Sequence, residues 1–336
     1  MKKNVTLMDI AKACNTSNVT VSKALSDKSG VSDELREKIK KVAEEMGYIQ
    51  TKTVYTKKKS SIGVLIPAKY VNTSGSYYWT LYNCVAQRLK REDLYCITEN
   101  IDKRDEENLI LPGILTDKKV GILISLGQLS DTYVQKLAEN CEHLILLDYY
   151  VPGLKVDSIV SNGYNGGYKL ASYLISMGHR KIGFVGSKLA TSSIFDRYMG
   201  YLKALIEHGL EIRDDWVIDD RNRDNDLIDL TFPQDMPTAF VCNCDETAYM
   251  AIKQLRDMGI SVPEQVSVVG YDNYLISEIA DPAITTISID EDYMAELCVN
   301  TLKQRMNDPS TIYRMRTIEG ELVIKNSVLP LRANED

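Results

Sequence analysis

The stretch that decides the fold is NVTLMDIAKACNTSNVTVSKALSDKSGVS, residues 4–32. Within it, Thr6 precedes Asp9 by three positions, and the apolar residue Ile10 follows directly. Such a pair can form a capping box, in which each side chain accepts a hydrogen bond from the backbone N–H of the other residue. This pattern marks the start of a helix. We therefore expect a first helix over residues 7–14.

Two further helices follow this first one. Ser17 can cap a helix over residues 18–26, and Ser32 can cap another over residues 33–46, which Gly47 ends. The third helix carries an apolar stripe formed by Leu35, Ile39, Val42 and Met46. Two short helices that are joined by a tight turn and braced by a third describe a helix-turn-helix domain.

The second helix is expected to expose polar side chains. In a helix-turn-helix, the N-terminal part of the second helix enters the major groove of DNA. The Asn18 amide could bond a base edge there, Val19 could touch a thymine methyl group, and Lys23 could reach a guanine edge or a phosphate. The alternative is a three-helix bundle that binds a protein through the same surface.

The distribution of charge favours DNA as the partner of this head. The chain of 336 residues has a formal net charge of -7. Residues 1–61 carry 13 Lys/Arg against 7 Asp/Glu, a net charge of +6, while the remainder carries 27 against 40, a net charge of -13. A basic head on an acidic body indicates that the head, and not the body, contacts a polyanion.

Several other classes of protein are disfavoured. No apolar run approaches the ~18 residues that span a bilayer, and the start MKKN is unlike a signal peptide, so we expect a cytoplasmic location without membrane contact. Seven scattered cysteines without a CxxC pair, and three histidines, favour reduced thiols over a metal site. The glycine-rich stretch GYNGGYKLA, residues 163–171, does not fit G-x-G-x-x-G, and no Walker A or HExxH motif occurs. We therefore expect no cofactor and no catalytic residue.

Beyond residue 61, apolar strands alternate with amphipathic helices, which indicates parallel sheets that are covered on both faces. The predicted strands are IGVLIP (62–67), LYCIT (94–98), VGILIS (120–125), HLILLD (143–148), KIGFVG (181–186), TAFVCN (238–243) and VSVVGY (266–271). The predicted helices are 79–91, 131–140, 166–177, 197–208 and 246–258. These units suffice for two lobes, with a ligand cleft between them beyond the carboxyl ends of the strands.

Charged side chains at the strand ends indicate what such a cleft could bind. Asp148 ends one predicted strand, Asp272 follows another, and Arg197 opens the helix after KIGFVG. A carboxylate accepts hydrogen bonds from hydroxyl groups, and a planar guanidinium donates several, so this combination suits a polyhydroxyl ligand.

Aromatic side chains are expected beside these charges. Tyr77, Tyr78 and Trp79 are candidates for stacking on the apolar face of a sugar ring, although one of the three is expected to pack in the core instead. Asp245 follows another strand, where it either lines the cleft or caps the helix that comes next.

Two parts of the chain carry a resemblance to a known family. Residues 5–49 match the pattern T-x-x-D-I-A-x-x-x-x-x-S-x-x-T-V-S, followed by V-S-x-x-x-R-x-K-I and G-Y. This head resembles the DNA-binding head of the LacI/GalR family of bacterial transcription regulators. The segments ASYLISMGHRKIGFVG, VPEQVSVVGYDN and ITTISID resemble the periplasmic-binding-protein-like effector domain of the same family. Together they cover essentially the whole chain.

The resemblance implies an α/β fold class, with an N-terminal three-helix helix-turn-helix domain followed by a two-lobed periplasmic-binding-protein-like domain with parallel sheets. The implied domains are 1–48 for DNA binding, 49–61 as linker and hinge, and 62–336 for effector binding and dimerisation. Lobe one would comprise about 62–161 and 290–320, and lobe two about 162–289 and 321–330. Asn162 and Asn165 match family positions at the crossover between the lobes.

The resemblance also implies partners. A homodimer would place two heads on a pseudo-palindromic, double-stranded operator, and an effector in the cleft would change the affinity for that operator. The implied DNA-contacting residues are Thr6, Ser17, Asn18, Val19, Thr20, Ser22, Lys23, Tyr48 and Lys52. The implied effector-contacting residues are Tyr77, Tyr78, Trp79, Asp148, Arg197, Asp245 and Asp272.

We therefore predict a repressor of carbohydrate-utilisation genes that responds to a mono- or oligosaccharide. One alternative is a regulator of the same architecture that responds to a purine or another metabolite. A second alternative is a sugar-binding protein without a DNA-binding role.

The linker IQTKTVYTKKKSS, residues 49–61, departs from the family pattern. In the family this region forms a hinge helix, from which a leucine wedges into the minor groove. Here Gln50-Thr51 replaces the usual Pro-Asn, and no leucine is present, although Val54 or Tyr55 could substitute. The alternative is a flexible tether whose lysines attract phosphates.

Overall fold

The computed structural model describes residues 5–25, 29–46, 61–71, 77–222 and 225–331. The chain separates into two compact units, Met1–Lys59 and Ser60–Asp336, and each is described by itself. The predictions for the linker, for Gly47 and for the DNA contacts of Tyr48 and Lys52 fall outside the described residues.

The first unit contains the three expected helices, and their predicted bounds are correct to within one residue at each end. They are α1 (Leu7–Ala13), α2 (Asn18–Leu25) and α3 (Asp33–Glu45). The capping box is confirmed, because the Thr6 backbone N–H donates to Asp9 Oδ2 at 2.9 Å and the Asp9 N–H donates to Thr6 Oγ1 at 3.4 Å. Ser17 and Ser32 cap the next two helices as predicted.

The core of this unit is small and built from compact side chains. Its buried members are Ile10, Ala11, Cys14, Val21, Ala24, Ile39 and Ala43. The alanines let the helix backbones approach one another. Burying each of the larger aliphatic side chains contributes about 1.5–3 kcal/mol, so this core can hold the three short helices together.

The second unit has two lobes. Lobe one is built on a six-stranded parallel sheet in the order β11-β5-β4-β3-β1-β2. Its strands are β1 (Ser61–Pro67), β2 (Tyr95–Ile101), β3 (Ile122–Leu126), β4 (His143–Leu147), β5 (Asp157–Ser161) and β11 (Met315–Ile318). Its helices are α4 (Ala68–Val71), α5 (Tyr77–Arg91), α6 (Lys103–Glu107), α7 (Gly113–Thr116), α8 (Asp131–Asn140) and α13 (Glu291–Asn307).

Alternation along the strands gives lobe one two apolar faces. Val64 of β1 packs in the same core as α5 and α13, whereas its neighbour Leu65 packs with α7 and α8. The sheet is therefore covered on both faces, as the apolar strands predicted. The helix α13 comes from late in the chain but packs on α5, where Arg88 binds Asp292 and Glu296.

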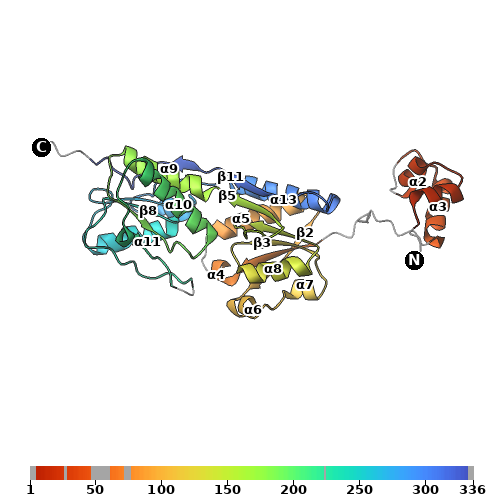
Figure 1. Ribbon diagram of the computed structural model, residues 1–336, viewed down its shortest axis with the longest axis horizontal. Coiled ribbons are helices and arrows are strands. Elements are labelled where there is room, and N and C mark those ends of the chain that lie inside the picture. The colour runs from red at the N-terminus through yellow and green to blue at the C-terminus, as the bar shows by residue number, and fades with distance from the viewer. Residues whose placement is uncertain (1–4, 26–28, 47–60, 72–76, 223–224, 332–336) are drawn as a thin grey trace. The chain divides into compact units, whose positions relative to one another are not determined.

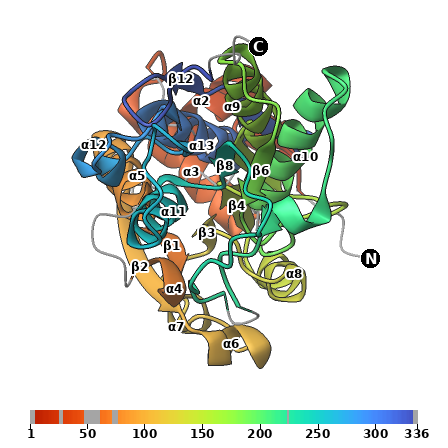
Figure 2. The same ribbon diagram turned by 90° about the vertical axis from the view of Figure 1, so that its left-hand side faces the viewer.

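Lobe two is built on a four-stranded parallel sheet in the order β7-β6-β8-β9. Its strands are β6 (Ile182–Val185), β7 (Val217–Ile218), β8 (Ala239–Cys242) and β9 (Ser267–Val269). Its helices are α9 (Gly163–Ser176), α10 (Ser192–Glu207), the 3-10 turn Asp214–Trp216, α11 (Asp245–Asp257) and α12 (Leu275–Ile279). The helices α9 and α10 lie on one side of β6 and β8, and α11 lies on the other (Figure 2).

The chain crosses between the lobes more than once, so neither lobe is a continuous segment (Figure 1). A small antiparallel pair, β10 (Thr286–Ser288) and β12 (Glu321–Val323), lies near these crossings. Glu319 ties two of them together, because Asn162 and Asn165 donate to its carboxylate at 2.6 and 2.5 Å. No helix in the described part of the chain is long and apolar enough to cross a membrane.

Two of the predicted helix starts are wrong. The helix α9 begins at Gly163, three residues earlier than expected, because the Asn162 side chain caps it despite the glycines that follow. The helix α10 begins at Ser192, because Thr191 accepts a hydrogen bond from the Ile194 N–H at 3.1 Å. Arg197 therefore lies in the second turn of this helix and does not open it.

Candidate functional site

The second helix of the head presents a polar, solvent-exposed face. Its buried side is formed by Val21 and Ala24, while Val19 is 64% exposed. Ser17, Asn18, Ser22 and Lys23 are exposed too, and Thr20 is half-buried. Val19 therefore presents an apolar side chain on the otherwise polar face of α2.

Lobes one and two enclose a cavity of about 360 Å³. Its walls come from α4, α5 and the end of β4 in lobe one, and from α10 and the ends of the parallel strands in lobe two. The lining residues include five of the seven predicted effector contacts, namely Tyr77, Tyr78, Asp148, Arg197 and Asp272. The structure therefore brings together side chains that are up to 195 positions apart, from Tyr77 to Asp272.

Both aspartates of this group lie at strand ends in a strained backbone conformation. Asp148 has φ of 70° and Asp272 has φ of 104°, a region that residues other than glycine rarely adopt. Such strain costs of the order of 1–3 kcal/mol and persists only where the surroundings enforce it. Here it aims two carboxylates at the cavity.

Arg197 contacts one of these carboxylates and lies near the other. Its Nη1 donates to the Asn243 carbonyl at 2.6 Å, and its Nη2 donates to Asp272 Oδ1 at 3.3 Å. The guanidinium also lies over the Tyr271 ring, 3.7 Å from the centroid. Within the described residues its buried Nε has no hydrogen-bond partner.

Two buried carboxyl groups lie near one guanidinium, and burial dominates their protonation. Burial raises the pKa of Asp148 to about 6, although Arg197 and the hydroxyls of Tyr77 and Tyr78 oppose the shift. Burial also raises the pKa of Asp272 well above its usual range. The site therefore holds hydrogen-bonding groups that can both accept and donate near neutral pH.

The three predicted aromatic residues have different environments. Tyr77 is almost fully buried, and its hydroxyl donates to Asp148 Oδ1 at 3.4 Å. Tyr78 stacks on Tyr70, with ring centroids 4.1 Å apart. Trp79 does not line the cavity: it is 50% exposed and stacks on Tyr82 instead. The helical period turns its side chain away from the face that carries its two neighbours.

Asp245 lies outside the cavity as well, and it is not a helix cap, because Cys244 occupies that position. Its buried carboxyl accepts hydrogen bonds from Thr286 Oγ1 at 2.6 Å and from the Tyr274 N–H at 3.2 Å. Burial raises its pKa to about 7. Asp245 therefore supports the loop that carries Asp272.

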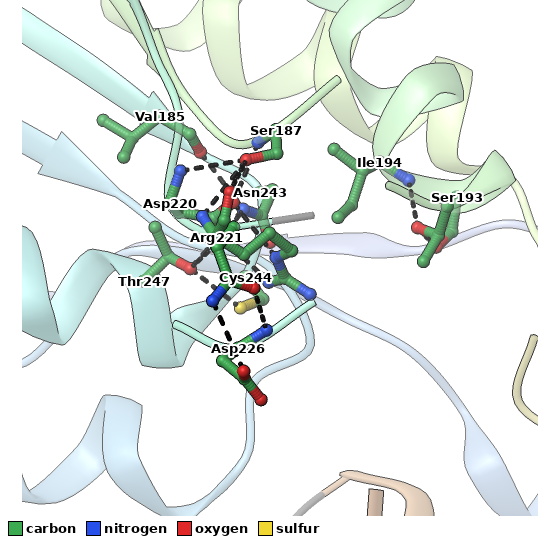
Figure 3. Close-up of polar contacts among 12 residues, drawn as sticks. Val185, Ser187, Ser193, Ile194, Asp220, Arg221, Asp226, Asn243, Cys244 and Thr247 are labelled. Atoms are coloured by element: carbon green, nitrogen blue, oxygen red, sulfur yellow. Dashed lines mark hydrogen bonds and ion pairs between the residues drawn. The ribbon is translucent and has the colours of Figure 1, made fainter. Parts of the chain in front are cut away.

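The sequence analysis missed several charged residues of the cavity. Lys69, Arg221, Asp226 and Glu246 line it, and Asp220 lies directly behind Arg221. Figure 3 shows Asp220 surrounded by Ser187, Arg221, Asn243 and Thr247. The strand β7 before this cluster has only two residues, so no apolar run signalled a strand end there.

Glycines of GYNGGYKLA serve helix packing. A Cβ atom at Gly167 would lie 2.0 Å from the Arg197 carbonyl oxygen, and one at Gly200 would lie 1.8 Å from the Tyr164 carbonyl oxygen. The helices α9 and α10 therefore touch backbone to backbone beside Arg197. In the described part of the chain no cluster of histidine, cysteine, aspartate or glutamate could hold a metal ion.

Comparison with known proteins agrees with both units. Residues 6–50 match the model of bacterial regulatory proteins of the lacI family, and residues 171–328 match that of the periplasmic binding protein-like domain. The ribose operon repressor of Haemophilus influenzae is 28% identical over 97% of this chain and 99% of its own length. The transcriptional repressor PurR of Pasteurella multocida is also 28% identical, over 96% and 98%.

A solved structure shows the same fold. The complex of the transcriptional regulator CelR with cellobiose has a TM-score of 0.68 and 20% identity, and covers 96% of this chain and 100% of its own. The curated relatives are transcriptional regulators and not enzymes. The chain therefore belongs to the LacI family of DNA-binding transcriptional repressors, with a helix-turn-helix head and a periplasmic-binding-protein-like domain.

Proposed function

We propose that this protein is a homodimeric repressor of carbohydrate-utilisation genes, whose affinity for its operator changes when a sugar binds in the cavity between lobes one and two. The observation that carries the proposal is the convergence of Asp148, Arg197 and Asp272 on one cavity. Two carboxyls and a guanidinium complement the alternating donor and acceptor character of neighbouring hydroxyl groups.

The charges of the cavity favour a neutral ligand. The cationic lining residues are Lys69, Arg197 and Arg221, and the acidic ones are Asp148, Asp226, Glu246 and Asp272. Because these charges nearly balance, an anionic ligand would gain little and would meet several carboxylates. A neutral polyol can use both kinds of group.

A purine is the rival effector, since regulators of this architecture need not bind sugars: one relative is named the ribose operon repressor and another the transcriptional repressor PurR. A planar base commonly requires a slot between apolar or aromatic surfaces. In this cavity Tyr70 and Tyr78 stack on each other at 4.1 Å, which leaves no slot between them. A purine would therefore have to lie elsewhere in the cavity, and the preference for a sugar rests on the charged groups.

For the head, the exposed face of α2 supports DNA contact by the predicted set of residues. Asn18, Val19 and Lys23 would contact base edges, while Thr6, Ser17, Thr20 and Ser22 would contact the phosphate backbone. The two residues Tyr48 and Lys52 belong to the same proposal through the family pattern.

Dimer formation is supported by an apolar surface on lobe two. The helices α11 and α12 contact each other, and they expose Tyr249, Leu275 and Ile279, the last two by more than 60%. Exposed apolar side chains on two helices that contact each other make this face a candidate for a protein contact. Light scattering of the wild type and of Leu275→Asp would test it, and a monomeric wild type would refute dimer formation.

The DNA-binding part can be tested with the full chain. Selection from a random duplex pool supplies an operator, and fluorescence anisotropy then gives the affinity of the wild type, of Lys23→Ala and of the control Lys41→Ala. Lys41 is an exposed lysine of α3, so both variants lose the same charge. We expect Lys23→Ala to lose about 1–3 kcal/mol of specific binding and the control to lose much less. Equal effects of the two variants would refute the assigned recognition helix.

The effector part can be tested by a thermal-shift screen of the wild type. Mono- and disaccharides are compared with hypoxanthine and guanine. We expect at least one saccharide to raise the melting temperature and to change the affinity for the selected operator. If only a purine stabilises the protein, the sugar effector is wrong, but the proposed repressor function is unaffected.

A further inference from the structure

We infer that the outward face of α10 (Ser192–Glu207) is a second surface for self-association, on which two copies of this chain pack their α10 helices antiparallel. This inference goes beyond the proposed function, because the dimer proposed above uses α11 and α12. The helices α10 and α11 lie on opposite sides of the lobe-two sheet (Figure 2). The two surfaces are therefore separate, and a chain that uses both would join two dimers into a tetramer.

The helix α10 carries apolar side chains on two opposite sides. Its inner side packs on α9 and the lobe-two sheet and includes Tyr201, which is 1% exposed. Its outer side carries a second apolar stripe, formed by Phe195, Met199, Leu202 and Ile206. The exposed fractions in this stripe reach from 39% for Phe195 and Met199 to 63% for Ile206. Because a helix at the surface of a soluble protein normally has one apolar side, the stripe that the described residues leave open indicates contact with another molecule.

The order of the stripe favours a second copy of the same helix. Its members are four, three and four positions apart, a coiled-coil spacing that is the same when it is read from either end. A second α10 that runs antiparallel therefore matches the stripe position for position about a two-fold axis, the symmetry of most homodimers. Phe195 then lies opposite the partner's Ile206. At the centre, Met199 lies opposite the partner's Leu202.

Charged side chains beside the stripe fit the same arrangement. Asp196 and Lys203 each follow a member of the stripe by one position, and both flank it on the side of α9. A Cβ atom at Gly163 of α9 would lie 3.3 Å from Asp196 Cβ, and Lys203 Nζ lies 4.9 Å from the centroid of a tyrosine ring of the same helix, that of Tyr168. Antiparallel helices meet along this flank, so Asp196 lies opposite the partner's Lys203, and the two-fold axis repeats the pair. Parallel packing would not bring these opposite charges together.

Both charged groups have capacity for this contact. The Asp196 carboxylate accepts from the Tyr150 hydroxyl at 3.3 Å and can accept from further donors. Lys203 Nζ lies 3.6 Å from Glu207 Oε1, but its side chain is 43% exposed, and an ammonium group donates three hydrogen bonds. Exposed ion pairs contribute little each, so the apolar stripe supplies the affinity and the charges set the direction of the helices.

The size of the surface sets the strength of the association. Tyr164 of α9 is 42% exposed and enlarges the stripe beside Lys203, whose Nζ lies over its ring. A single pair of helices nevertheless buries less than the roughly 1,200–2,000 Å² of a standard interface. We therefore expect association through α10 at micromolar concentrations and dissociation below them.

Sedimentation velocity of the full chain without effector, from about 0.5 to 100 µM, tests this surface. Met199→Glu places a charge in the stripe. Its control Met315→Glu places the same charge on β11 in lobe one, where Met315 is 57% exposed. Lys203→Glu reverses a flanking charge, and its control Lys155→Glu changes an exposed lysine of lobe one. The melting temperature shows whether each variant is folded.

Crosslinking tests the direction of the helices. The variants Phe195→Cys and Ile206→Cys are oxidised separately and as a mixture, and the wild type with its seven cysteines gives the background. Antiparallel packing brings the two introduced thiols together only in the mixture. We therefore expect crosslinked pairs of chains in the mixture, and none above background in either variant alone.

We expect the wild type to change from dimer to tetramer over this range of concentration. Met199→Glu should raise the dissociation constant of the tetramer at least ~10-fold, because a buried charge without a partner is strongly unfavourable. Lys203→Glu should raise it roughly 3- to 10-fold, since two flanking pairs are lost. Both controls should associate as the wild type does.

Three outcomes would overturn the inference. If the wild type stays a dimer at the highest concentration, α10 does not self-associate, while the proposed dimer stands. If Met199→Glu and Lys203→Glu associate as the wild type does, another surface forms the tetramer. If either cysteine variant crosslinks alone as well as the mixture does, the helices are not antiparallel.

The proposed dimer can fail separately. A wild type that forms only dimers, which Met199→Glu dissociates and Leu275→Asp does not, would support the contact through α10 and refute the one through α11 and α12. A monomer at every concentration would refute both surfaces.

Discussion

Replacing Gly167 with alanine should displace α10 and with it Arg197. The added Cβ would lie 2.0 Å from the Arg197 carbonyl oxygen and 3.0 Å from its Cα atom. Ordinary contact begins near 3.4 Å, so the two helices would have to separate by about 1.4 Å. Backbone atoms meet on the α10 side of this contact, so rotation of a side chain cannot relieve the overlap.

The displacement is large compared with the tolerance of the site. Arg197 Nη1 donates to the Asn243 carbonyl at 2.6 Å. A shift of about 1 Å would bring this pair to about 3.6 Å, at which a hydrogen bond no longer exists. Overpacking of this kind costs about 1–3 kcal/mol of folding free energy. We therefore expect a melting temperature lower by about 2–10 °C and an effector affinity at least ~10-fold weaker.

Differential scanning fluorimetry and calorimetry with the effector found by the saccharide screen would measure both quantities. Gly113→Ala is the control, since its Cβ would meet Glu99 Oε1 at an ordinary 3.6 Å, in lobe one. If Gly167→Ala lowers the melting temperature but binds the effector as the wild type does, the contact of α9 with α10 does not position Arg197. The helices would then overlap as described, but their contact would not control the effector site.

Three further predictions concern the cavity. Arg197→Met leaves two buried carboxyls without their cation, which costs about 3–5 kcal/mol of folding free energy, although protonation of Asp272 partly relieves this cost. The variant should lose the effector response and keep operator binding. Normal release of DNA by the variant with saturating effector, measured by anisotropy, would contradict the assigned effector site. Gln128→Ala removes a contact between the lobes, in which Gln128 accepts from the Ser192 N–H at 2.7 Å. Calorimetry should show up to ~10-fold weaker effector binding, whereas unchanged binding would mean that this contact does not support the effector site. The pKa of Asp148 is raised from 3.8 to about 6, so folding takes up a proton between these pH values. This group's contribution to the free energy of unfolding should therefore fall as pH rises through that window, and effector affinity should weaken up to ~10-fold per pH unit below pH 6. If calorimetry gives the same effector affinity throughout pH 5 to 7, Asp148 does not accept a hydrogen bond from the ligand.

The sequence by itself determined the local structure of the head. Thr6, Ser17 and Ser32 each supply an oxygen for the backbone N–H groups of the turn that follows, so three helix starts could be predicted from single residues. The parallel sheets could be predicted too, because strands buried on both faces need long apolar runs such as SIGVLIP at residues 61–67. Short or polar strands gave no such signal, and β5, with the sequence DSIVS, was missed.

Within the cavity, the sequence indicated the residues that follow recognisable strands or match the family pattern, such as Asp148 and Asp272. It could not separate Tyr78 from Trp79, because adjacent residues of a helix differ only in the direction that their side chains take. Nor could it find Arg221 and Asp220, which lie after a two-residue strand in a polar stretch.

Only the tertiary structure decided how these groups combine. Asn243 joins Arg197 to Asp220 through two of its atoms, and Gly167 lets α9 approach the backbone of Arg197. Such contacts join elements that are far apart in the sequence. The two sheets bring these elements together, because the chain enters each lobe more than once. Their distances follow from packing, which no local pattern of residues encodes.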